Sequence, residues 1–261
     1  MAKNSKSGIS IAVNENGISK QSIRQRIWRH LEESNLATFP RPVYNRIPNF
    51  KGSNQACMKA AELACYRAAK VVKVNPDKPQ EHLRLLSLQD RKVLLVPTPR
   101  LRSGLFNRII PPQPTTHWVL KKCATSQGVR EFSEPIGLLD TAKYHVDVII
   151  IGSVAVSKEG HRIGKGEGFA DLEFAMMAAM GAVTPETMVI TTVHDCQVFD
   201  ELPRHLFGKN DVPVDFIVTP TESYEVKNRL PKPSGVYWEI LHPQKFLEIP
   251  ILRQFREWDK Q

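Results

Sequence analysis

Residues 146–180 of this chain read V-D-V-I-I-I-G-S-V-A-V-S-K-E-G-H-R-I-G-K-G-E-G-F-A-D-L-E-F-A-M-M-A-A-M. The opening V-D-V-I-I-I is a β-branched apolar run, typical of a strand buried on both faces. The closing run, Leu172 to Met180, consists of strong helix formers with almost no polar face. Between them, three glycines stand at alternate positions, Gly164, Gly166 and Gly168. The stretch therefore predicts a strand, then a glycine-rich loop, then a helix.

The glycine loop has the composition of an anion site. Glycines carry no Cβ, so successive N–H groups can close around an anion, and a following helix adds its partial positive charge. Arg162 and Lys165 bracket the loop, and Asp171 ends it with a carboxylate able to hold Mg²⁺. This pattern is that of a nucleotide polyphosphate cradle. Glycines also serve tight turns, and the spacing matches neither G-x-G-x-x-G nor G-x-x-x-x-G-K-[ST], so a structural turn remains an equal alternative.

The rest of the chain alternates predicted strands and helices. The expected strands are 69–74, 92–99, 145–151, 188–193, 214–219 and an edge strand near 236, and the expected helices include 53–70, 81–88 and 168–180. Such alternation predicts an α/β fold, a mainly parallel sheet flanked by helices on both faces. Ligands of these sheets bind beyond the carboxyl ends of the strands. The glycine loop, Pro97–Arg100, His194–Asp195 and Thr219–Pro220 are expected at such ends.

The N-terminal region divides at about residue 18. Residues 1–17 are polar and are expected to form a flexible tail, and residues 18–261 a single α/β domain. A helix is expected after the N-cap Ser19. At about 100° per residue, Lys20 and Arg24 share its apolar stripe. Either their apolar stems are buried while the charged heads reach solvent, or both heads reach into a cleft that holds an anion.

Composition and charge limit the possible classes of protein. Hydrophobic residues make up 41% of the 261 residues, enough for a sizeable core, yet no apolar run approaches the roughly 18 residues of a membrane span. No signal-peptide pattern is present, and the four cysteines show no metal spacing, so we expect free thiols and a cytoplasmic location. The net charge of +9 favours polyanionic partners, among them ATP, folates or, non-specifically, RNA.

Several segments together resemble the 5-formyltetrahydrofolate cyclo-ligases, also called methenyltetrahydrofolate synthetases. The glycine loop is similar to their R-[LI]-G-x-G-x-G-Y-Y-D, and Lys20 and Arg24 match an N-terminal K-x-x-x-R. D-C-Q-V-F-D-E-L-P and N-D-V-P-V-D-F-I-V-T-P also match, so the resemblance covers roughly residues 18–222. It is strongest to the branch of methenyltetrahydrofolate synthetase domain-containing proteins, through R-I-P-N-F-K-G and V-H-D-C-Q.

The resemblance implies a fold like those of ribose-5-phosphate isomerase and the CoA transferases. It also implies the conversion of ATP and 5-formyltetrahydrofolate to 5,10-methenyltetrahydrofolate, ADP and phosphate, with Mg²⁺. Carried over, Asp171 and Asp211 would hold the metal, and Arg162 and Lys165 are the candidate catalytic residues. ATP would be bound by Lys20, Arg24, Arg162, Ile163, Gly164, Lys165, Gly166, Glu167, Gly168, Phe169 and Ala170. The folate substrate would contact Lys73, Gly166, Phe169 and Ala170.

The departures from the family pattern concern the folate half of the site. Phe169 and Ala170 replace a Tyr-Tyr pair, and the Glu expected near residues 73–76 is replaced by Lys73. Two classes therefore stay open: an active ATP- and Mg²⁺-dependent cyclo-ligase, or a catalytically reduced relative that acts as a binding module, for RNA for example. His194–Asp195 is interpreted as a hydrogen-bonded structural pair, and the oligomeric state stays open.

Overall fold

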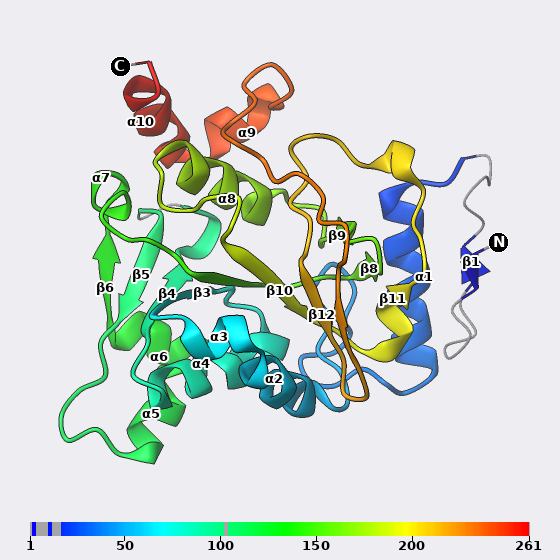
Figure 1. Ribbon diagram of the computed structural model, residues 1–261, viewed down its shortest axis with the longest axis horizontal. Helices are drawn as coiled ribbons and strands as arrows, with labels where there is room; N and C mark the ends of the chain where they lie inside the picture. The colour runs from blue at the N-terminus through cyan, green and yellow to red at the C-terminus, as the bar shows by residue number, and fades with distance from the viewer. Residues whose placement is uncertain (1, 4–9, 12–16, 102–103, 261) are drawn as a thin grey trace.

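A computed structural model describes residues 2–3, 10–11, 17–101 and 104–260. Its centre is an eight-stranded sheet with the order β13-β12-β10-β7-β3-β4-β5-β6 (Figure 1). The five parallel strands are β3 (Val71–Val74), β4 (Val93–Pro97), β7 (Val148–Ile151), β10 (Met188–Thr192) and β12 (Phe216–Val218). The antiparallel edge strands are β5 (Phe106–Ile109), β6 (Ser133–Ile136) and β13 (Ser223–Glu225). The expected mainly parallel sheet is confirmed.

Helices cover both faces of this sheet, as predicted (Figure 1). One apolar core lies under α2 (Ser53–Glu62), α3 (Ala64–Ala68), α4 (Glu81–Gln89), α5 (His117–Cys123) and α6 (Ser126–Glu131). A second core lies under α7 (Leu138–Thr141), α8 (Phe169–Ala179), α9 (Pro243–Glu248) and α10 (Pro250–Trp258). All four residues of β7 are buried, because central parallel strands are covered on both faces.

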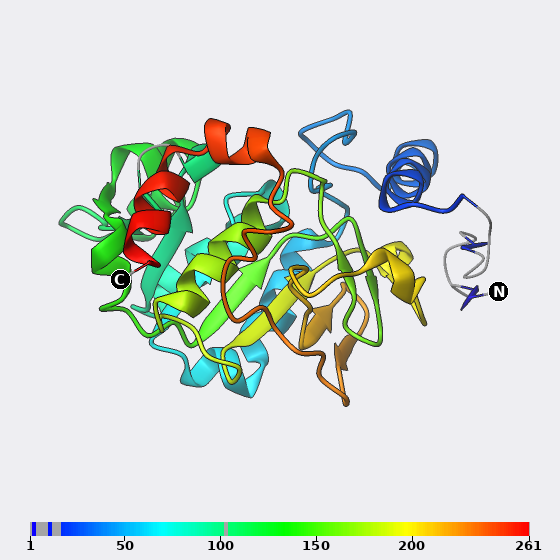
Figure 2. The same ribbon diagram turned by 90° about the horizontal axis from the view of Figure 1, so that it is seen from above.

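The N-terminal helix α1 (Lys20–Glu33) belongs to a third layer beside the main sheet (Figure 2). It packs on a small sheet of β11 (Val198–Phe199), β8 (Ala155–Ser157) and β9 (Arg162–Ile163). Ser19 caps α1 as expected, because its side chain accepts from the N–H of Ser22. The strand pair β8–β9 occupies the interval between β7 and the glycine loop, for which no strand was expected.

Some expected elements differ in the structure. The expected helix 53–70 divides into α2 and α3, because Leu63 has an extended conformation with ψ of 136°. No strand forms near residue 236 in the described chain, and the outer edge is β13 instead. Short 3₁₀ turns fill several connections: Lys78–Gln80, Pro99–Leu101, Asp195–Gln197 and Arg204–Leu206.

The expected tail falls largely outside the described residues. Within it, β1 (Ala2–Lys3) pairs antiparallel with β2 (Ser10–Ile11). The four cysteines, Cys57, Cys65, Cys123 and Cys196, are free thiols, as expected. Among the described residues, no helix is both long enough and apolar enough to cross a membrane.

Candidate functional site

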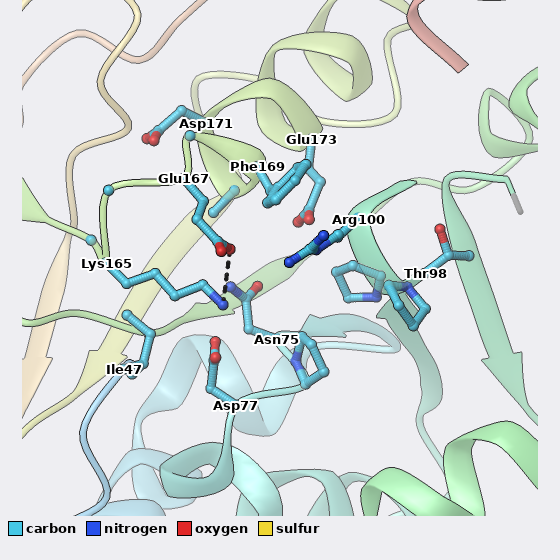
Figure 3. Close-up of a pocket in the computed structure, with 18 of the residues that line it drawn as sticks. Ile47, Asn75, Asp77, Thr98, Arg100, Lys165, Glu167, Phe169, Asp171 and Glu173 are labelled. Atoms are coloured by element: carbon cyan, nitrogen blue, oxygen red, sulfur yellow. Dashed lines mark ion pairs between the residues drawn. The ribbon is translucent and has the colours of Figure 1, made fainter. Parts of the chain in front are cut away.

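A cavity of about 580 Å³ opens beyond the carboxyl ends of β3, β4 and β7. Its walls come from segments far apart in the sequence: 75–77 after β3, 97–100 after β4, Gly152 after β7, and the loop 164–171 (Figure 3). The two remaining strand ends, His194–Asp195 and Thr219–Pro220, are not among the residues that line it. The carboxyl edge of the sheet thus holds a cavity where the fold class predicted one.

Helix α1 contributes two cations to this cavity. Lys20 and Arg24 both line it, so both residues reach a cleft, and the anion of the second interpretation stays a prediction. The Nζ of Lys20 lies 2.5 Å from Oδ1 of Asp211. The Nε of Arg24 donates to the carbonyl of Gly164 at 2.7 Å, which ties α1 to the glycine loop. Arg29, on the same helix, is exposed.

The glycines of the loop make room for guanidinium groups. A Cβ on Gly164 would lie 2.7 Å from Nη1 of Arg162, and a Cβ on Gly166 would lie 3.2 Å from Cζ of Arg24. Gly166 also has a φ of +103°, which L side chains rarely adopt. A turn alone does not require two arginines packed against it, so this arrangement favours an anion site over a purely structural turn.

The cations of this loop stand close together in a half-buried environment. Burial, and next the neighbouring Arg162, lower the pKa of Arg24. Arg162 itself is buried, and its Nη2 lies 3.5 Å from Oδ1 of Asp171. Lys165 extends over the cavity and pairs with Glu167 at 3.2 Å (Figure 3). Two mutually repelling guanidinium groups and an extended lysine provide a favourable setting for a polyanion.

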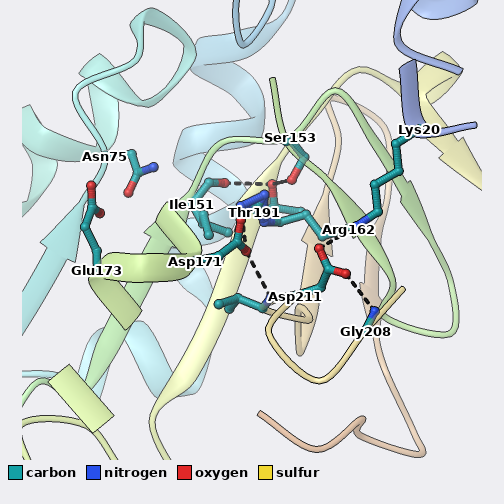
Figure 4. A network of polar contacts seen from close by, with 12 residues as sticks. Lys20, Asn75, Ile151, Ser153, Arg162, Asp171, Glu173, Thr191, Gly208 and Asp211 are labelled. Carbon is teal, nitrogen blue, oxygen red and sulfur yellow. Dashed lines mark hydrogen bonds and ion pairs between the residues drawn. The ribbon is translucent and has the colours of Figure 1, made fainter. Parts of the chain in front are cut away.

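Asp171 and Asp211 both face this cationic end. Oδ1 of Asp171 accepts from the backbone N–H of Val212 at 3.0 Å, so the two carboxylates belong to adjoining segments (Figure 4). The other oxygen of Asp211 accepts from the N–H of Gly208. Asp211 lies in the loop before β12. Both carboxylates line the same cavity, and their role as metal ligands stays a prediction.

The donor set suits a metal that is only partly held by protein. No group of three or more His, Cys, Asp or Glu side chains able to hold a metal occurs among the residues described. Lys20 and Arg162 already balance the two carboxylates. Magnesium usually takes one or two carboxylates and completes its shell with water and phosphate oxygens. Asp171 and Asp211 fit that role only together with a phosphate ligand.

Lys73 lies behind the cavity wall and not in it. Its side chain is 1% exposed, and its Nζ pairs with Oε2 of Glu173 at 2.6 Å. The same Nζ donates to Oδ1 of Asn75 at 2.7 Å. Asn75 and Glu173 line the cavity, whereas Lys73 does not. The expectation that Lys73 contacts a substrate is therefore wrong for a ligand in this cavity, because the lysine is buried against Glu173 and Asn75.

A carboxylate does face the cavity, one residue beyond the segment 73–76 in which an acidic residue was expected. Asp77 lines the cavity and points toward the same space as Lys165 and Arg100 (Figure 3). Burial raises the pKa of Asp77, and the nearby Lys165 and Arg84 oppose that rise. The cavity therefore contains an acidic side chain close to the position where Lys73 stands.

Arg84 shapes the same region from α4. Its fully buried guanidinium donates to the carbonyls of Asn75, Asp77 and Ala124, and so fixes the segment that carries Asp77. Burial lowers the pKa of Arg84 to about 10. The sequence signal for Arg84 was its place on the inner stripe of α4, four residues before the buried Leu88.

The remaining predicted residues divide between the wall and the core. Glu167, Phe169 and Ala170 line the cavity, as do Gly166 and Gly168. The Nζ of Lys245 in α9 lies 4.9 Å from the ring centre of Phe169. Ile163, by contrast, is fully buried in the core under α1 and does not line the cavity, so the expected contact of its side chain with ATP is wrong.

His194 and Asp195 form separate structural contacts. His194 Nδ1 accepts from the N–H of Cys196, and Asp195 accepts from Thr219 and Thr221. The structural interpretation fits these contacts, although no hydrogen bond joins the two side chains to each other among the bonds described.

Comparison with known proteins identifies the family. The chain is 53% identical over 251 residues to the methenyltetrahydrofolate synthase domain-containing protein of Danio rerio, which covers 96% of this chain and 65% of that protein. The corresponding protein of Homo sapiens is 54% identical over 245 residues, 94% of this chain and 63% of the relative. This chain thus spans a little less than two thirds of these curated relatives.

A solved structure and a family model also match. The NMR structure of Aquifex aeolicus 5,10-methenyltetrahydrofolate synthetase aligns with a TM-score of 0.48 at 18% identity, over 85% of this chain and 99% of that one. The model of the 5-formyltetrahydrofolate cyclo-ligase family matches residues 16–220, most of the chain. With the identities above, this match shows that the chain belongs to the 5-formyltetrahydrofolate cyclo-ligase family.

Proposed function

We propose that this protein is an ATP- and Mg²⁺-dependent cyclo-ligase that acts on a reduced folate carrying an N-formyl group. The observation that carries the proposal is the packing of Arg24 and Arg162 against Gly166 and Gly164, which places two guanidinium groups at one loop. This arrangement is suited to the phosphates of ATP. Family membership supports the same assignment.

Four cations would hold the polyphosphate: Lys20, Arg24, Arg162 and Lys165. They approach from α1 and from the glycine loop, so the ligand would bridge two layers of the fold. Their positive charge is only partly balanced by Asp171, Asp211 and Glu167, which pair with three of them. A bound polyphosphate would therefore relieve repulsion between Arg24 and Arg162.

Asp171 and Asp211 would hold magnesium together with oxygens of the phosphates. When bound, it neutralises charge on the phosphate oxygens during transfer. The contribution of the protein is to keep both carboxylates oriented, through Val212 N–H for Asp171 and Gly208 N–H for Asp211.

The other half of the cavity would accept the folate. Asp77 offers an acceptor to the N–H groups at the edge of a pterin ring, and Phe169 offers an aromatic wall. Arg84 holds the segment of Asp77 in place. The formyl oxygen would then point toward the glycine loop, where Arg162 and Lys165 stabilise developing negative charge.

Phosphoryl transfer from ATP drives the overall reaction, and no water is consumed. The formyl oxygen takes the terminal phosphoryl group of ATP and ADP leaves, after which N10 attacks the activated carbon and loses its proton to solvent. Phosphate departs with the former formyl oxygen as the five-membered ring closes to 5,10-methenyltetrahydrofolate. Positioning and charge neutralisation account for most catalysis of phosphoryl transfer, which suits a site made of cations and backbone amides.

Two measurements test the proposal. Calorimetric titration with Mg·ATP should show binding that Arg162→Ala and Arg24→Ala weaken at least tenfold, whereas the matched control Arg29→Ala on the exposed side of α1 should bind like wild type. The absorbance of methenyltetrahydrofolate should then rise from 5-formyltetrahydrofolate only when ATP is present. Equal nucleotide affinity in all variants would refute the phosphate site, and binding without turnover would refute the cyclo-ligase activity alone.

A binding module without turnover is the second candidate, favoured by the net charge of +9 and by Ala170 at a cavity wall. RNA would then bind non-specifically, with an affinity that falls steeply as salt rises. Sequence-selective RNA binding that survives moderate salt would favour this candidate over the enzyme.

A further inference from the structure

A buried ion pair stands at the wall of the main cavity, in segments that are otherwise apolar. Lys73 belongs to β3, whose other three residues are valines, and Glu173 belongs to α8, whose later residues are all apolar. The two side chains are 1% and 6% exposed. Replacing a buried ion pair by apolar side chains of similar volume is often neutral or stabilising. Stability alone therefore does not explain why charges occupy these two positions.

The lysine also holds Asn75, and this bond fixes the orientation of the asparagine amide. The Nζ of Lys73 lies 2.7 Å from Oδ1 of Asn75 and 2.6 Å from Oε2 of Glu173. A lysine ammonium group only donates hydrogen bonds, so the atom of Asn75 that faces it must be the amide oxygen. The amide nitrogen, Nδ2, therefore points away from Lys73. Because both side chains bond to one nitrogen, Asn75 and Glu173 lie side by side.

Asn75 and Glu173 turn their remaining polar atoms toward the cavity. Both residues line it, whereas Lys73 does not, and both side chains project into the space beside Arg100 (Figure 3). Among the described residues, no hydrogen bond reaches Oε1 of Glu173 or Nδ2 of Asn75. Neither atom is sealed in the core, since the buried atoms without a partner in the described part of the chain are others. The cavity wall thus offers a carboxylate acceptor beside an amide donor.

This pair of groups matches one kind of ligand edge. Oε1 of Glu173 requires a hydrogen-bond donor from the ligand, and Nδ2 of Asn75 requires an acceptor beside that donor. Phosphate oxygens only accept, so the phosphates of a nucleotide do not satisfy the glutamate. A planar ring that carries an N–H group next to a carbonyl, a cyclic amide, satisfies both side chains. The pterin ring of a reduced folate has such an edge.

We propose that Glu173 and Asn75 recognise the cyclic-amide edge of the substrate, and that Lys73 is the positioning residue beneath them. This inference rests on the proposed function and names residues that select its second substrate. Asp77 would serve other N–H groups of the same ring. Because Lys73 holds both side chains in place before the ligand arrives, they lose little freedom on binding. A site built in this way can reject a ligand without the matching groups by about 10⁴–10⁵-fold.

An exchange of the two groups tests the inference without removing the ion pair. In Glu173→Gln/Asn75→Asp, an oxygen of each new side chain still accepts from Lys73, so the net charge and the bonds of the lysine are kept. An amide now faces the cavity where the carboxylate did, and the reverse, so the hydrogen-bonding pattern of the wall is inverted. Calorimetric titration should show an affinity for 5-formyltetrahydrofolate at least a hundredfold below that of wild type, whereas the affinity for Mg·ATP should change less than threefold. A purely structural pair predicts no change in either affinity.

Two further variants keep this test decisive. Lys73→Met/Glu173→Leu removes both charges together and should lower the affinity for 5-formyltetrahydrofolate at least tenfold, which tests the inference even if the exchanged variant does not fold. The control Gln127→Glu/Glu131→Gln makes the same exchange in an exposed hydrogen-bonded pair outside the cavity, and it should bind both ligands like wild type.

Two results would overturn the inference and leave the proposed function standing. One is wild-type affinity for 5-formyltetrahydrofolate in a folded variant of the pair, and the other is a folded variant that loses affinity for Mg·ATP instead. Absence of 5-formyltetrahydrofolate binding by wild type would overturn the inference and the proposed substrate together.

Discussion

Replacing Lys73 with Met should destabilise the protein strongly, although Lys73 does not line the cavity. Its Nζ lies 2.6 Å from Oε2 of Glu173, and the two side chains are 1% and 6% exposed. At an effective dielectric constant of about 20, unit charges at that distance attract by roughly 6 kcal/mol. Part of this attraction offsets the desolvation of both ions, and removing one partner of a buried pair costs about 3–5 kcal/mol. We expect Lys73→Met and Glu173→Leu each to lower the free energy of unfolding by that amount.

The free energy of unfolding should fall far less in the double variant than in either single variant. Lys73→Met/Glu173→Leu leaves no unpaired buried charge and keeps the side-chain volumes similar, so we expect a loss of about 1–2 kcal/mol, most of it from the unpaired Asn75 amide oxygen. Urea unfolding followed by both fluorescence and circular dichroism would measure this, provided the two transitions coincide. A double variant whose loss equals the sum of the single losses would refute the pair as the cause.

The pH dependence gives an independent check of the same reasoning. Burial already raises the pKa of Glu173 in the folded protein, and Lys73 opposes that rise. In Lys73→Met the folded-state pKa should rise further above the unfolded value. A raised carboxyl pKa costs nothing below the unfolded pKa, and its cost grows as pH rises toward the folded pKa. The stability difference between wild type and Lys73→Met should therefore be smaller at pH 4.5 than at pH 7.5, and a constant difference would contradict this.

Three further predictions concern the cavity. Gly166→Ala should weaken Mg·ATP binding about tenfold in calorimetry, because the new Cβ displaces Arg24. Gly181 also has a positive φ but lies in open space, so the control Gly181→Ala should lower the stability of the protein and leave its affinity for Mg·ATP unchanged. Asp171→Asn should reduce the Mg²⁺ dependence of nucleotide binding and abolish turnover in a protein that still folds, because the amide oxygen can still accept from Val212; full turnover would exclude the metal role. Ala170→Tyr should raise cyclo-ligase turnover by narrowing the cavity beside the folate, and intact ATP binding without that gain would argue against folate as the substrate.

The central fold could be predicted from sequence because its signals are strong and local. The β-branched run of β7 and the apolar helix α8 have one plausible secondary structure each, and both formed where expected. The stripe of α1 placed Lys20 and Arg24 correctly, because helical periodicity fixes the side on which a residue lies. Each of these predictions depends only on residues that are close in the sequence, within about two helical turns.

The edges of the sheet could not be predicted in the same way. β5, β6 and β13 are short, and their pairing is decided by contacts across the sheet and not by local pattern. The expected strand near residue 236 had a suitable composition, V-Y-W-E-I-L, yet its Trp238 packs against Phe255 and Phe246 of the C-terminal helices. Tertiary packing of a large aromatic side chain outweighed β propensity there.

The residues around Lys73 show why a prediction from one sequence position is less reliable than a prediction from a whole segment. Lys73 stands where a carboxylate was expected, so the sequence suggested that the folate half had lost its acidic group. In the structure, Lys73 is neutralised by Glu173 from α8, and Asp77 brings a carboxylate into the cavity four residues later. The lysine and the two acids act as one set, because a buried cation is tolerated only beside an anion. The net charge at this end of the cavity therefore depends on all three side chains. Lys73 considered alone gives the wrong sign for that net charge.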